Sequence, residues 1–444
     1  MTGAFAHTSS TTRPLPYERD AAVWVEHFAH LPGLVFLDSR KRRSEVGRFD
    51  IITALPDRIY RLSDYMHPSA WMAAIESDIA DAPQSGRSRI ALGFFDFESA
   101  ASQLGVPRAP LRPATAGVFS WHILQDHQLG RAWLVIDDDI DPEILQCVEQ
   151  CLTTSATHPP VRNDFCLHSP FEPDLSADQY AADVNAIRRY IEAGDCYQVN
   201  YAHRFSAACA GSPLSAYLAL RNAAPGDFSA YLNLDADHAV LSLSPERFLS
   251  VEGRKVKTQP IKGTRPRGQT PEEDARLADE LKHSAKDRAE NVMIVDLLRN
   301  DLGKVCEPGS VVTTELCSLH SFDNVHHLVS MVEGVLTGDI TPGQAMVACS
   351  PGGSITGAPK KRAVQIIQEL EQAPRGVYCG SVFALGSDGW LQSSIAIRTL
   401  EIVGDQIYCW GGGGIVHESE AAAEYQETLD KVGVFMRSLS GSRR

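Results

Sequence analysis

The order of strand-like and helix-like segments is what most constrains how this chain can fold. Short apolar segments of strand length recur in both halves of the sequence, at 34–37, 49–54, 90–97, 132–136, 196–205, 228–234, 239–243, 247–251, 255–261, 377–385, 393–403 and 406–409. Helical patterns are fewer, at about 176–194, 271–304 and 419–438, and the first begins with the capping-box pair Ser176 and Gln179. Strands often follow strands directly, as through the turn at Glu252–Gly253. The order is neither strictly βαβ nor all-β, and it predicts an α+β fold in which large antiparallel β-sheets form a sandwich flanked by helices.

Composition and the positions of prolines and glycines divide the 444 residues into four segments. Residues 1–20 are expected to be a flexible leader and not a signal peptide, because they contain no apolar stretch. An N-terminal region at 21–155 is followed by a proline-containing linker at 156–175 and by a C-terminal region at 176–438. The length is compatible with two or three ordinary domains or with one large intertwined unit.

The composition also limits the class of partner and the compartment. A formal net charge of −15 at pH 7 argues against a nucleic-acid-binding protein, which needs a basic face. The sequence has no run of about 18 apolar residues, so no membrane span is expected. The ten cysteines include no CxxC pair, and we expect reduced, mostly buried thiols in a cytoplasmic protein.

A lysine in a short strand, within residues 260–264, is the first candidate for chemistry. A strand lysine such as Lys262 is usually a solvated surface charge when it stands alone. Here the segment 244–248, with a glutamate, precedes it, and a glycine-rich run at 352–360 follows it. That run is not a P-loop, and it is either a helix-entry turn or a loop whose amides, with Ser354 and Thr356, face an anion.

Two predicted helices each carry a pair of acidic residues three positions apart. Asp287 and Glu290 share one helix face, and Glu424 and Glu427 share a face of the last helix. Acidic pairs of this kind are more often solvated than functional. Apolar neighbours, such as those at 292–295, indicate instead that these helices are largely buried. Four carboxylates that converged from two helices would repel one another without a cation, and oxygen ligands alone suit Mg²⁺.

Three further features have more than one interpretation. The four glycines at 411–414 either form a flexible turn or allow a ligand to approach main-chain amides. The pair His326–His327 is more often structural, but one of them could be a ligand or a base. Arg398 alternates with apolar residues in a predicted strand, and it either reaches solvent or pairs with a carboxylate.

Together these residues resemble the chorismate-utilising enzymes. The resemblance covers nearly all of 176–436, and its motifs occur in the family's order at 194–200, 244–248, 260–264, 287–291, 352–360 and 423–428. The N-terminal region is more weakly similar to the anthranilate-synthase-I-like companion region. Anthranilate synthases carry alanine where Lys262 stands, and isochorismate and salicylate synthases carry a water-activating lysine where Gln198 stands. An amide cannot act as a general base on water at pH 7, so the chain is most similar to members that aminate chorismate at C4.

The resemblance implies the chorismate-utilising enzyme fold and a reaction in which chorismate and ammonia give 4-amino-4-deoxychorismate for 4-aminobenzoate and folate synthesis. It implies that Lys262 forms a covalent adduct at ring C2 and that Glu246 protonates the leaving C4 hydroxyl. Mg²⁺ is the implied cofactor. The other implied site residues are Glu290 and Glu427 as direct metal ligands, Asp287 and Glu424 as ligands through water, His327 as a catalytic residue, and Thr264, Ser354, Tyr378, Arg398, Gly412, Gly414 and Lys431 as substrate-binding residues.

The source of ammonia is expected to be another protein. Cys196 has no flanking glycine to build a nucleophile turn, and no cysteine pairs with a His–Glu dyad, so a separate glutamine amidotransferase subunit (component II) is implied. The product would pass to a downstream aminodeoxychorismate lyase. By resemblance, a possible tryptophan pocket would involve Ser39, Arg48 and Phe49. Two alternatives stay open: anthranilate synthase component I, and a non-catalytic relative that binds chorismate or tryptophan.

Overall fold

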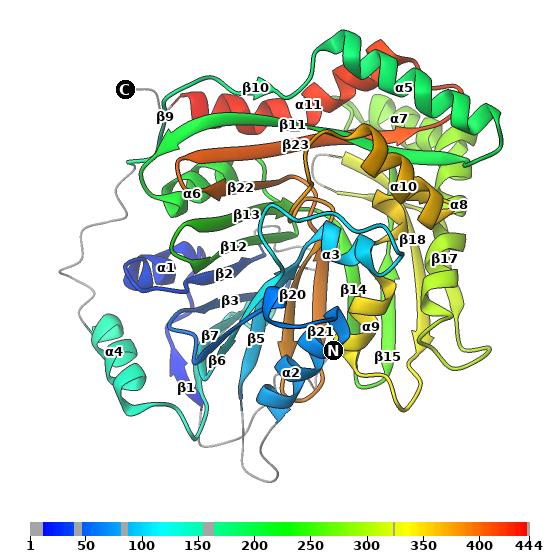
Figure 1. Ribbon diagram of the computed structural model, residues 1–444. Helices are drawn as coiled ribbons and strands as arrows, with labels where there is room; N and C mark the ends of the chain where they lie inside the picture. The colour runs from blue at the N-terminus through cyan, green and yellow to red at the C-terminus, as the bar shows by residue number, and fades with distance from the viewer. Residues whose placement is uncertain (1–11, 40–46, 81–87, 154–163, 323–324, 442–444) are drawn as a thin grey trace.

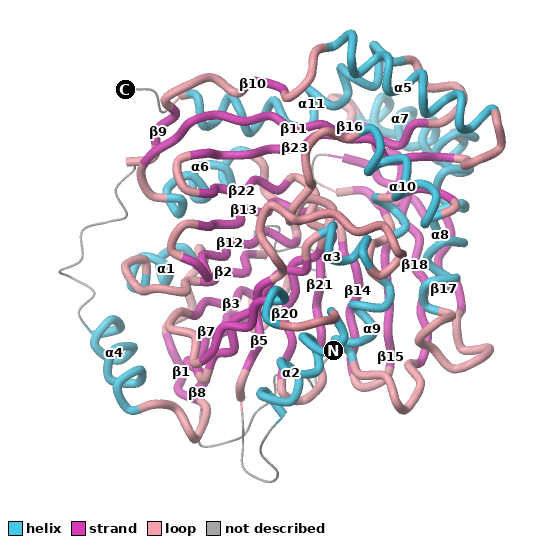
Figure 2. Tube along the Cα trace, viewed as in Figure 1, coloured by secondary structure: helices cyan, strands magenta, loops and turns pink. Residues whose placement is uncertain are grey.

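Two large antiparallel sheets form the centre of the computed structural model, which describes residues 12–39, 47–80, 88–153, 164–322 and 325–441 (Figures 1 and 2). Within these residues the first sheet has 13 strands and the second has 10. The predicted α+β fold is therefore confirmed. None of the helices in these ranges combines the length and the apolarity that crossing a bilayer requires.

The first sheet joins strands from both regions of the sequence. In spatial order it contains β1 (Thr12–Leu15), β8 (Arg131–Ile136), β7 (Trp121–Asp126), β3 (Phe49–Thr53), β2 (Val35–Asp38), β12 (Phe228–Asp235), β13 (His238–Ser244), β22 (Thr399–Val403), β23 (Gln406–Ile415), β11 (Gln198–Ala210) and β10 (Glu172–Pro173), with β9 (Cys166–Leu167) and β19 (Gly357–Ala358) also paired to β11. The two regions meet where Phe36 of β2 lies opposite Tyr231 of β12.

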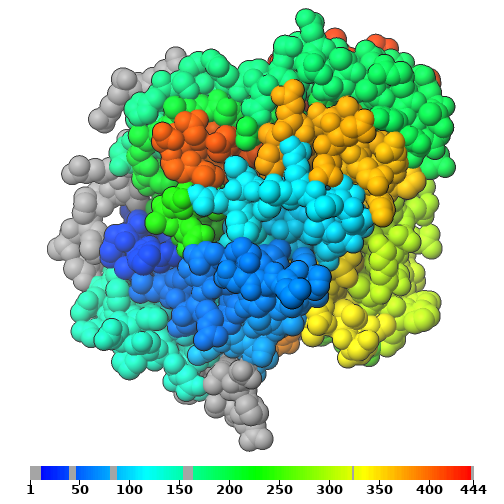
Figure 3. Space-filling view, viewed as in Figure 1, coloured from blue at the N-terminus to red at the C-terminus, as the bar shows by residue number. Residues whose placement is uncertain are grey.

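The second sheet joins the regions again, through β5 and β20. Its strands are, in spatial order, β16 (Ile261–Pro266), β18 (Val325–Val335), β15 (Lys255–Gln259), β14 (Arg247–Glu252), β21 (Leu391–Ile395), β20 (Ser381–Gly386), β5 (Ile90–Phe95), β6 (Thr115–Phe119) and β4 (Arg58–Arg61), with β17 (Val312–Ser321) paired to β18. Since both sheets cross the sequence boundary, the N- and C-terminal regions form one intertwined unit. In the space-filling view, blue and cyan N-terminal residues lie directly against green and orange C-terminal ones (Figure 3).

Helices cover the outer faces of the sheets (Figure 1). They are α1 (Ala22–Phe28), α2 (Pro68–Ala80), α3 (Phe97–Ser102), α4 (Pro142–Thr153), α5 (Ala177–Glu192), α6 (Pro213–Ala223), α7 (Pro271–His283), α8 (Ala285–Leu302), α9 (Pro342–Cys349), α10 (Lys360–Leu370) and α11 (Ala421–Ser440). One apolar cluster lies between the sheets, where Val35 and Ile51 of the first meet Leu92 and Phe94 of the second. Burial of such side chains from water is the main favourable term in folding.

The chain crosses from one sheet to the other at two neighbouring places. Between β13 and β14 it passes through Glu246, and between β21 and β22 it passes through Arg398. The crossings are hydrogen-bonded together, because Ile395 N donates to the carbonyl of Glu246 at 3.1 Å and Leu243 N donates to that of Arg398 at 3.0 Å. The fold therefore gathers two predicted site residues where the sheets meet.

Some expected boundaries differ from the structure. Residues 12–15, expected in the flexible leader, form β1, which pairs with β8; residues 1–11 lie outside the described part. The expected single strand 393–403 is two strands, because the chain changes sheets at Arg398, which has φ 52°. The described part of the linker, 164–175, includes β9 and β10 on the edge of β11. Main-chain pairing of this kind needs no apolar alternation, so a sequence pattern does not reveal it.

Candidate active site

Lys262 lies on β16 beside a bulge that redirects the strand. The pairing of β16 with β18 shifts between Lys262 and Thr264, and Gly263 between them has φ 79°. A Cβ on Gly263 would lie 2.9 Å from Cδ1 of Leu281, so glycine is needed there for both conformation and space. The Nζ atom of Lys262 lies 3.1 Å from Oε1 of Glu290 on α8.

Ser354 connects this lysine to Glu246. Its hydroxyl donates to Oε1 of Glu246 at 2.7 Å, and its carbonyl oxygen accepts a hydrogen bond from Nζ of Lys262 at 3.3 Å. Burial raises the pKa of Glu246, while the charge of Lys262 and the hydrogen bond from Ser354 act in the opposite direction. A buried carboxyl with a raised pKa is suited to donating a proton. The structure thus brings together the predicted nucleophile and the predicted acid.

The rest of the glycine-rich run supports this arrangement. After the short turn at Gly353–Ile355, Thr356 donates back to the carbonyl of Gly352 at 3.0 Å. Lys360 donates to Asp301 Oδ2 at 2.6 Å, at the start of α10. The hypothesis that Thr356 faces an anion is therefore wrong, because its hydroxyl is used inside the loop, whereas Ser354 does face the candidate site.

Thr264 and His327 form a pair on adjacent strands. They are cross-strand partners on β16 and β18, and Oγ1 of Thr264 lies 2.9 Å from Nδ1 of His327. The neighbouring His326 is buried and lies 3.0 Å from Asp274, so it has a structural role. The alternation of the strand separates the two histidines, and only His327 lies beside a predicted site residue.

The last helix approaches the glycines of β23. Nζ of Lys431 donates to the carbonyl of Gly412 at 2.8 Å and lies 2.7 Å from Oε1 of Glu427. A Cβ on Gly413 would lie 3.3 Å from Oε2 of Glu424, so the helix carboxylates face this strand. β22 pairs with β23 only as far as residue 409, and beyond it one edge of β23 lacks a strand partner among the described residues. Main-chain groups on that edge are therefore not used in sheet pairing with any described strand.

Gln198 and Gly414 are packed together at the other end of this edge. A Cβ on Gly414 would lie 2.1 Å from Nε2 of Gln198, so the amide side chain lies across the glycine. Gln198 is buried, and its Oε1 has no hydrogen-bond partner within the described part of the chain. A buried acceptor without a partner is costly in free energy, and an ordered water or a bound ligand would satisfy it.

The four predicted metal ligands form two pairs with basic neighbours. On α8, Glu290 pairs with Lys262, and Asp287 pairs with Arg265 at 3.3 Å. Both carboxylates are therefore paired with cationic side chains, which the negative charge of the two carboxylates attracts.

The pair on α11 also has a basic neighbour, Lys431. Burial raises the pKa of Glu424; repulsion from Glu427 adds to this, and the hydrogen bond from Ser419 and the charges of Lys286 and Lys431 oppose it. The charge of Lys286, on α8, thus acts on a carboxylate of α11. Among the residues that the structure describes, no three His, Cys, Asp or Glu side chains approach as closely as a bound metal requires. The donor set fits Mg²⁺ in kind, since it consists of carboxylate oxygens only, and the metal site stays a prediction.

Tyr378 and Arg398 lie near the crossings of the sheets. Tyr378 is buried and stacks on Trp410 of β23, with ring centroids 6.0 Å apart and planes 8° apart. It precedes β20 and was expected within a strand, but the chain turns there, with Gly376 at φ 62°. The exposed Arg398 forms no ion pair with any described residue, so its guanidinium is available to an anion.

Sequence analysis missed a group of buried charged residues behind Tyr378. Its members, all buried, are Glu98, Glu371, Arg375 and Glu401. Glu98 accepts a hydrogen bond from the amide of Arg375, which lies 277 positions away. No spacing or motif signals a contact between residues so far apart in the sequence.

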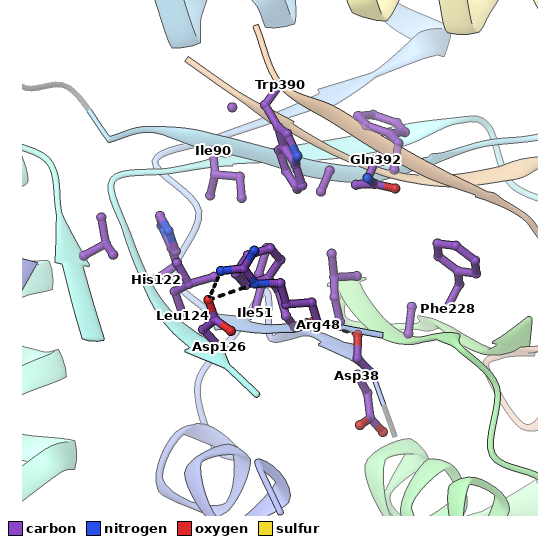
Figure 4. Close-up of a pocket in the computed structure, with 18 of the residues that line it drawn as sticks. Asp38, Arg48, Ile51, Ile90, His122, Leu124, Asp126, Phe228, Trp390 and Gln392 are labelled. Atoms are coloured by element: carbon purple, nitrogen blue, oxygen red, sulfur yellow. Dashed lines mark hydrogen bonds and ion pairs between the residues drawn. The ribbon is translucent and has the colours of Figure 1, made fainter. Parts of the chain in front are cut away.

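A separate cavity of about 440 Å³ lies between the sheets (Figure 4). The three residues predicted for a tryptophan pocket, Ser39, Arg48 and Phe49, all line it. Further lining residues come from both sheets and include Ile51, Ile90, Leu124, Phe228, Trp390 and Gln392. The structure therefore brings the predicted pocket residues to one cavity, with a mostly apolar wall and a few polar groups.

Hydrogen bonds hold several polar side chains that line the cavity in fixed orientations. Nε of Arg48 donates to Oδ2 of Asp126 at 2.9 Å, as the dashed lines in Figure 4 show. Ser39 donates to the carbonyl of Phe49 at 2.7 Å. Asp38 accepts from Nε of Arg221 at 2.6 Å.

Known proteins with similar sequences and structures include enzymes that act on chorismate. The family model described as chorismate binding enzyme matches residues 35–437. The chain is 37% identical to "Aminodeoxychorismate synthase component 1" of Escherichia coli (strain K12), over 96% of this chain and 97% of that protein. It is 45% identical to the protein of the same name from Klebsiella aerogenes, over 73% of this chain and 70% of that one. Anthranilate synthase component I from Streptococcus pneumoniae TIGR4 has a similar structure, with a TM-score of 0.77 and 29% identity over 88% of this chain and 92% of that one.

The chain belongs to the chorismate-binding enzyme family. Both the predicted family and the predicted fold class are thereby confirmed. Within the family, the two curated relatives share one name, which is that of a synthase of aminodeoxychorismate.

Proposed function

We infer that this chain is an enzyme that aminates chorismate at C4, giving 4-amino-4-deoxychorismate and water. The names of the curated relatives, which match over most of the chain, support this activity. The structural observation that carries it is the sharing of Ser354 by Lys262 and Glu246. A nucleophilic amine and a buried acid are thus held around one position, as a substitution that expels the C4 hydroxyl as water requires.

The proposed reaction has two substitutions. Nζ of Lys262, as the neutral amine, forms a bond to ring C2, the two ring double bonds shift, and the C4–O bond breaks as Glu246 transfers its proton to the leaving hydroxyl to form water. Ammonia then forms a bond to C4, the double bonds shift back, and the bond between C2 and Nζ breaks. The carboxylate of Glu246, left after the first step, accepts the proton that the added ammonia loses. Each step therefore balances in protons and electron pairs.

Other residues of the chain would bind and orient chorismate. Tyr378 and Arg398 are proposed to hold the enolpyruvyl carboxylate, since the guanidinium has no internal ion pair among the described residues. On the edge of β23 that lacks a described strand partner, we propose that main-chain groups of Gly412 and Gly414 contact chorismate on the side of its ring carboxylate. The remaining residues proposed to line the site are Thr264, His327 and Lys431.

Mg²⁺ is proposed as the cofactor. Glu290 and Glu427 would bind it directly, and Asp287 and Glu424 would act through water. When bound, the ion would neutralise the ring carboxylate and hold it in place. Gln198 supports ammonia rather than water as the nucleophile, because its amide cannot take a proton from water at neutral pH.

The naming of the relatives as component 1 implies a second component. We propose that this partner is a glutamine amidotransferase that supplies ammonia, and that an aminodeoxychorismate lyase uses the product in the cytoplasm. Cys196, the cysteine nearest the site motifs, is 2% exposed, and burial raises the pKa of its thiol. A buried thiol with a raised pKa is a poor nucleophile.

Product analysis tests the proposed activity. The purified chain is incubated with chorismate, MgCl₂ and an ammonium salt, and the products are separated by liquid chromatography and identified by mass. We expect 4-amino-4-deoxychorismate. Fluorescent anthranilate as the main product would establish the alternative activity instead, and no consumption of chorismate would favour a non-catalytic relative.

A second proposal concerns the cavity between the sheets, which we propose binds tryptophan. Its apolar wall suits an indole, and Arg48, Asp126 and Ser39 suit a carboxylate and an ammonium group. Isothermal titration with L-tryptophan tests it, with Arg48→Ala as the variant and Arg58→Ala, an exposed arginine on β4, as the control. Binding that is lost only in Arg48→Ala supports the proposal, and absence of binding to the wild-type chain contradicts it.

A further inference from the structure

Three successive main-chain amides before Tyr378 are each bound by a buried carboxylate. Glu98 accepts from the amide of Arg375 at 2.7 Å through Oε1 and from that of Gly376 at 2.9 Å through Oε2. Glu401 accepts from the amide of Val377 at 2.9 Å. Glu98 is 3% exposed and Glu401 is fully buried. The turn that carries Tyr378 is therefore held at every residue before it.

The N-terminal region contributes further contacts to this turn besides those of Glu98. The amide of Phe97 donates to the carbonyl of Gly376 at 2.9 Å, and the Phe97 ring lies 4.5 Å below the guanidinium of Arg375. Phe97 and Glu98 open helix α3, which follows β5 directly. The sheet therefore fixes these two residues, and they in turn hold the turn at 375–377.

The Arg375 side chain connects this turn to the loop that contains Ser354. It donates to both carboxylate oxygens of Glu371, at 2.9 and 2.6 Å. It also donates to the carbonyl of Ile355 at 3.0 Å and to that of Asn200 at 2.6 Å. Ile355 follows Ser354, which contacts Lys262 and Glu246. One buried arginine thus links the turn of Tyr378 with the loop of Ser354.

Stability alone is a weak explanation for so many buried charges. Removing carboxylates from water is costly, and well-packed apolar residues are often as stabilising as a buried ion pair. What the carboxylates provide is geometry, because each of the two oxygens of Glu98 specifies the place of one amide hydrogen.

We propose that Glu98 is a positioning residue of the chorismate site, which sets the place of Tyr378 and, through Arg375, of the loop that carries Ser354. This inference rests on the proposed function for the identity of the ligand. Its consequence is that the N-terminal region completes the substrate site, although no predicted substrate-binding or catalytic residue belongs to that region.

The test compares two glutamates with similar structural duties. Glu76 of α2 accepts from the hydroxyl of Thr341 at 2.6 Å and from the amide of Gly343 at 2.8 Å, and so joins the two regions away from the site. Glu98→Gln keeps one carbonyl oxygen and loses the second acceptor, and Glu76→Gln makes the same change at the control position. Dissociation constants for chorismate without ammonia, KM and kcat, and urea unfolding are measured for each.

We expect Glu98→Gln to raise the dissociation constant and the KM for chorismate about tenfold, the effect of losing one hydrogen bond from a buried main-chain amide. Glu76→Gln should lower stability and leave both constants unchanged. If Glu98→Gln is destabilised but binds chorismate normally, Glu98 is structural only and the inference is wrong. If Glu98→Gln does not fold, Glu98→Asp, which keeps both oxygens on a shorter side chain, decides by the same constants. A wild-type chain that does not bind chorismate would instead contradict the proposed function.

Discussion

The hydroxyl of Ser354 lies 2.7 Å from Oε1 of the buried Glu246 and donates a hydrogen bond to it. This bond stabilises the charged carboxylate and so opposes the effect of burial, which raises the pKa of Glu246. The acid that the reaction needs is the protonated form. Rates should therefore fall as the pH rises through this pKa.

Removal of the Ser354 hydroxyl should shift that pH dependence. Ser354→Ala loses the hydrogen bond to the carboxylate, so the pKa of Glu246 rises and the decline in kcat moves to higher pH. Glu246→Gln, which cannot donate the proton, should lower kcat roughly 10²- to 10⁴-fold at all pH values. The pH profiles of kcat check both outcomes, with Glu333→Gln on β18 as a control. If kcat of Ser354→Ala declines at the same pH as that of the wild-type chain, the decline is caused by a group other than Glu246.

Lys262→Ala should lower amination at C4 and direct some reaction to C2. The variant lacks the amine that would occupy C2, and it recreates the alanine of the anthranilate synthases. We expect a loss in kcat of about 100-fold or more, because an interaction used only in the transition state is removed. Lys257→Ala, on β15, the strand that precedes β16 in the sequence, is the control. An unchanged kcat with a raised KM would mean that Lys262 only anchors the substrate.

Activity should depend on Mg²⁺ and on all four acidic residues to different degrees. Excess EDTA should abolish turnover, and added MgCl₂ should restore it. The proposed direct ligands are tested by Glu290→Gln and Glu427→Gln, which should each be inactive because charge and geometry are both lost. Asp287→Asn and Glu424→Gln should be milder, since water can adjust. Full turnover in EDTA would contradict the proposed metal site.

The isolated chain should use ammonia and not glutamine. The rate with ammonium salts should rise with pH, as NH₃ replaces NH₄⁺, until the acid Glu246 loses its proton. Glutamine should support turnover only after an amidotransferase subunit is added. Glutamate release by the chain alone, measured by a coupled assay and abolished by Cys196→Ser, would overturn this prediction.

The stability of the fold should carry a pH dependence from Glu98. Burial and repulsion from Asp96 raise the pKa of Glu98 from 4.5 to about 8, and hydrogen bonds from the amides of Arg375 and Gly376 oppose them. The folded chain therefore holds a proton that the unfolded chain has lost, so the contribution of Glu98 to stability falls as the pH rises between these values. Urea unfolding from pH 5 to 8.5 should show a smaller decline in Glu98→Gln. Parallel curves for the two proteins would contradict the raised pKa.

Local patterns in the sequence were sufficient for much of the fold and for the reacting groups. Half of the predicted capping box is present: the side chain of Ser176 accepts from the amide of Gln179 at 3.2 Å, whereas the side chain of Gln179 donates to Asp183 at 2.9 Å. Most predicted strands occur close to their expected bounds, because a buried strand needs a run of apolar residues that is visible in the sequence. Lys262 and Glu246 could be named in advance because each lies in a short motif, and the family comparisons confirm the relationship on which their roles depend.

Long-range packing decided the rest. The break at Arg398 depends on the chain changing sheets there, which residues near it in the sequence do not specify. The turn of Tyr378 depends on Glu98, 277 positions before Arg375, whose amide it accepts from. The cavity between the sheets exists only because side chains of both sheets leave that volume unfilled. Sequence periodicity reports whether a residue is buried, whereas the identity of its neighbours depends on strand order and register, which are properties of the whole folded chain.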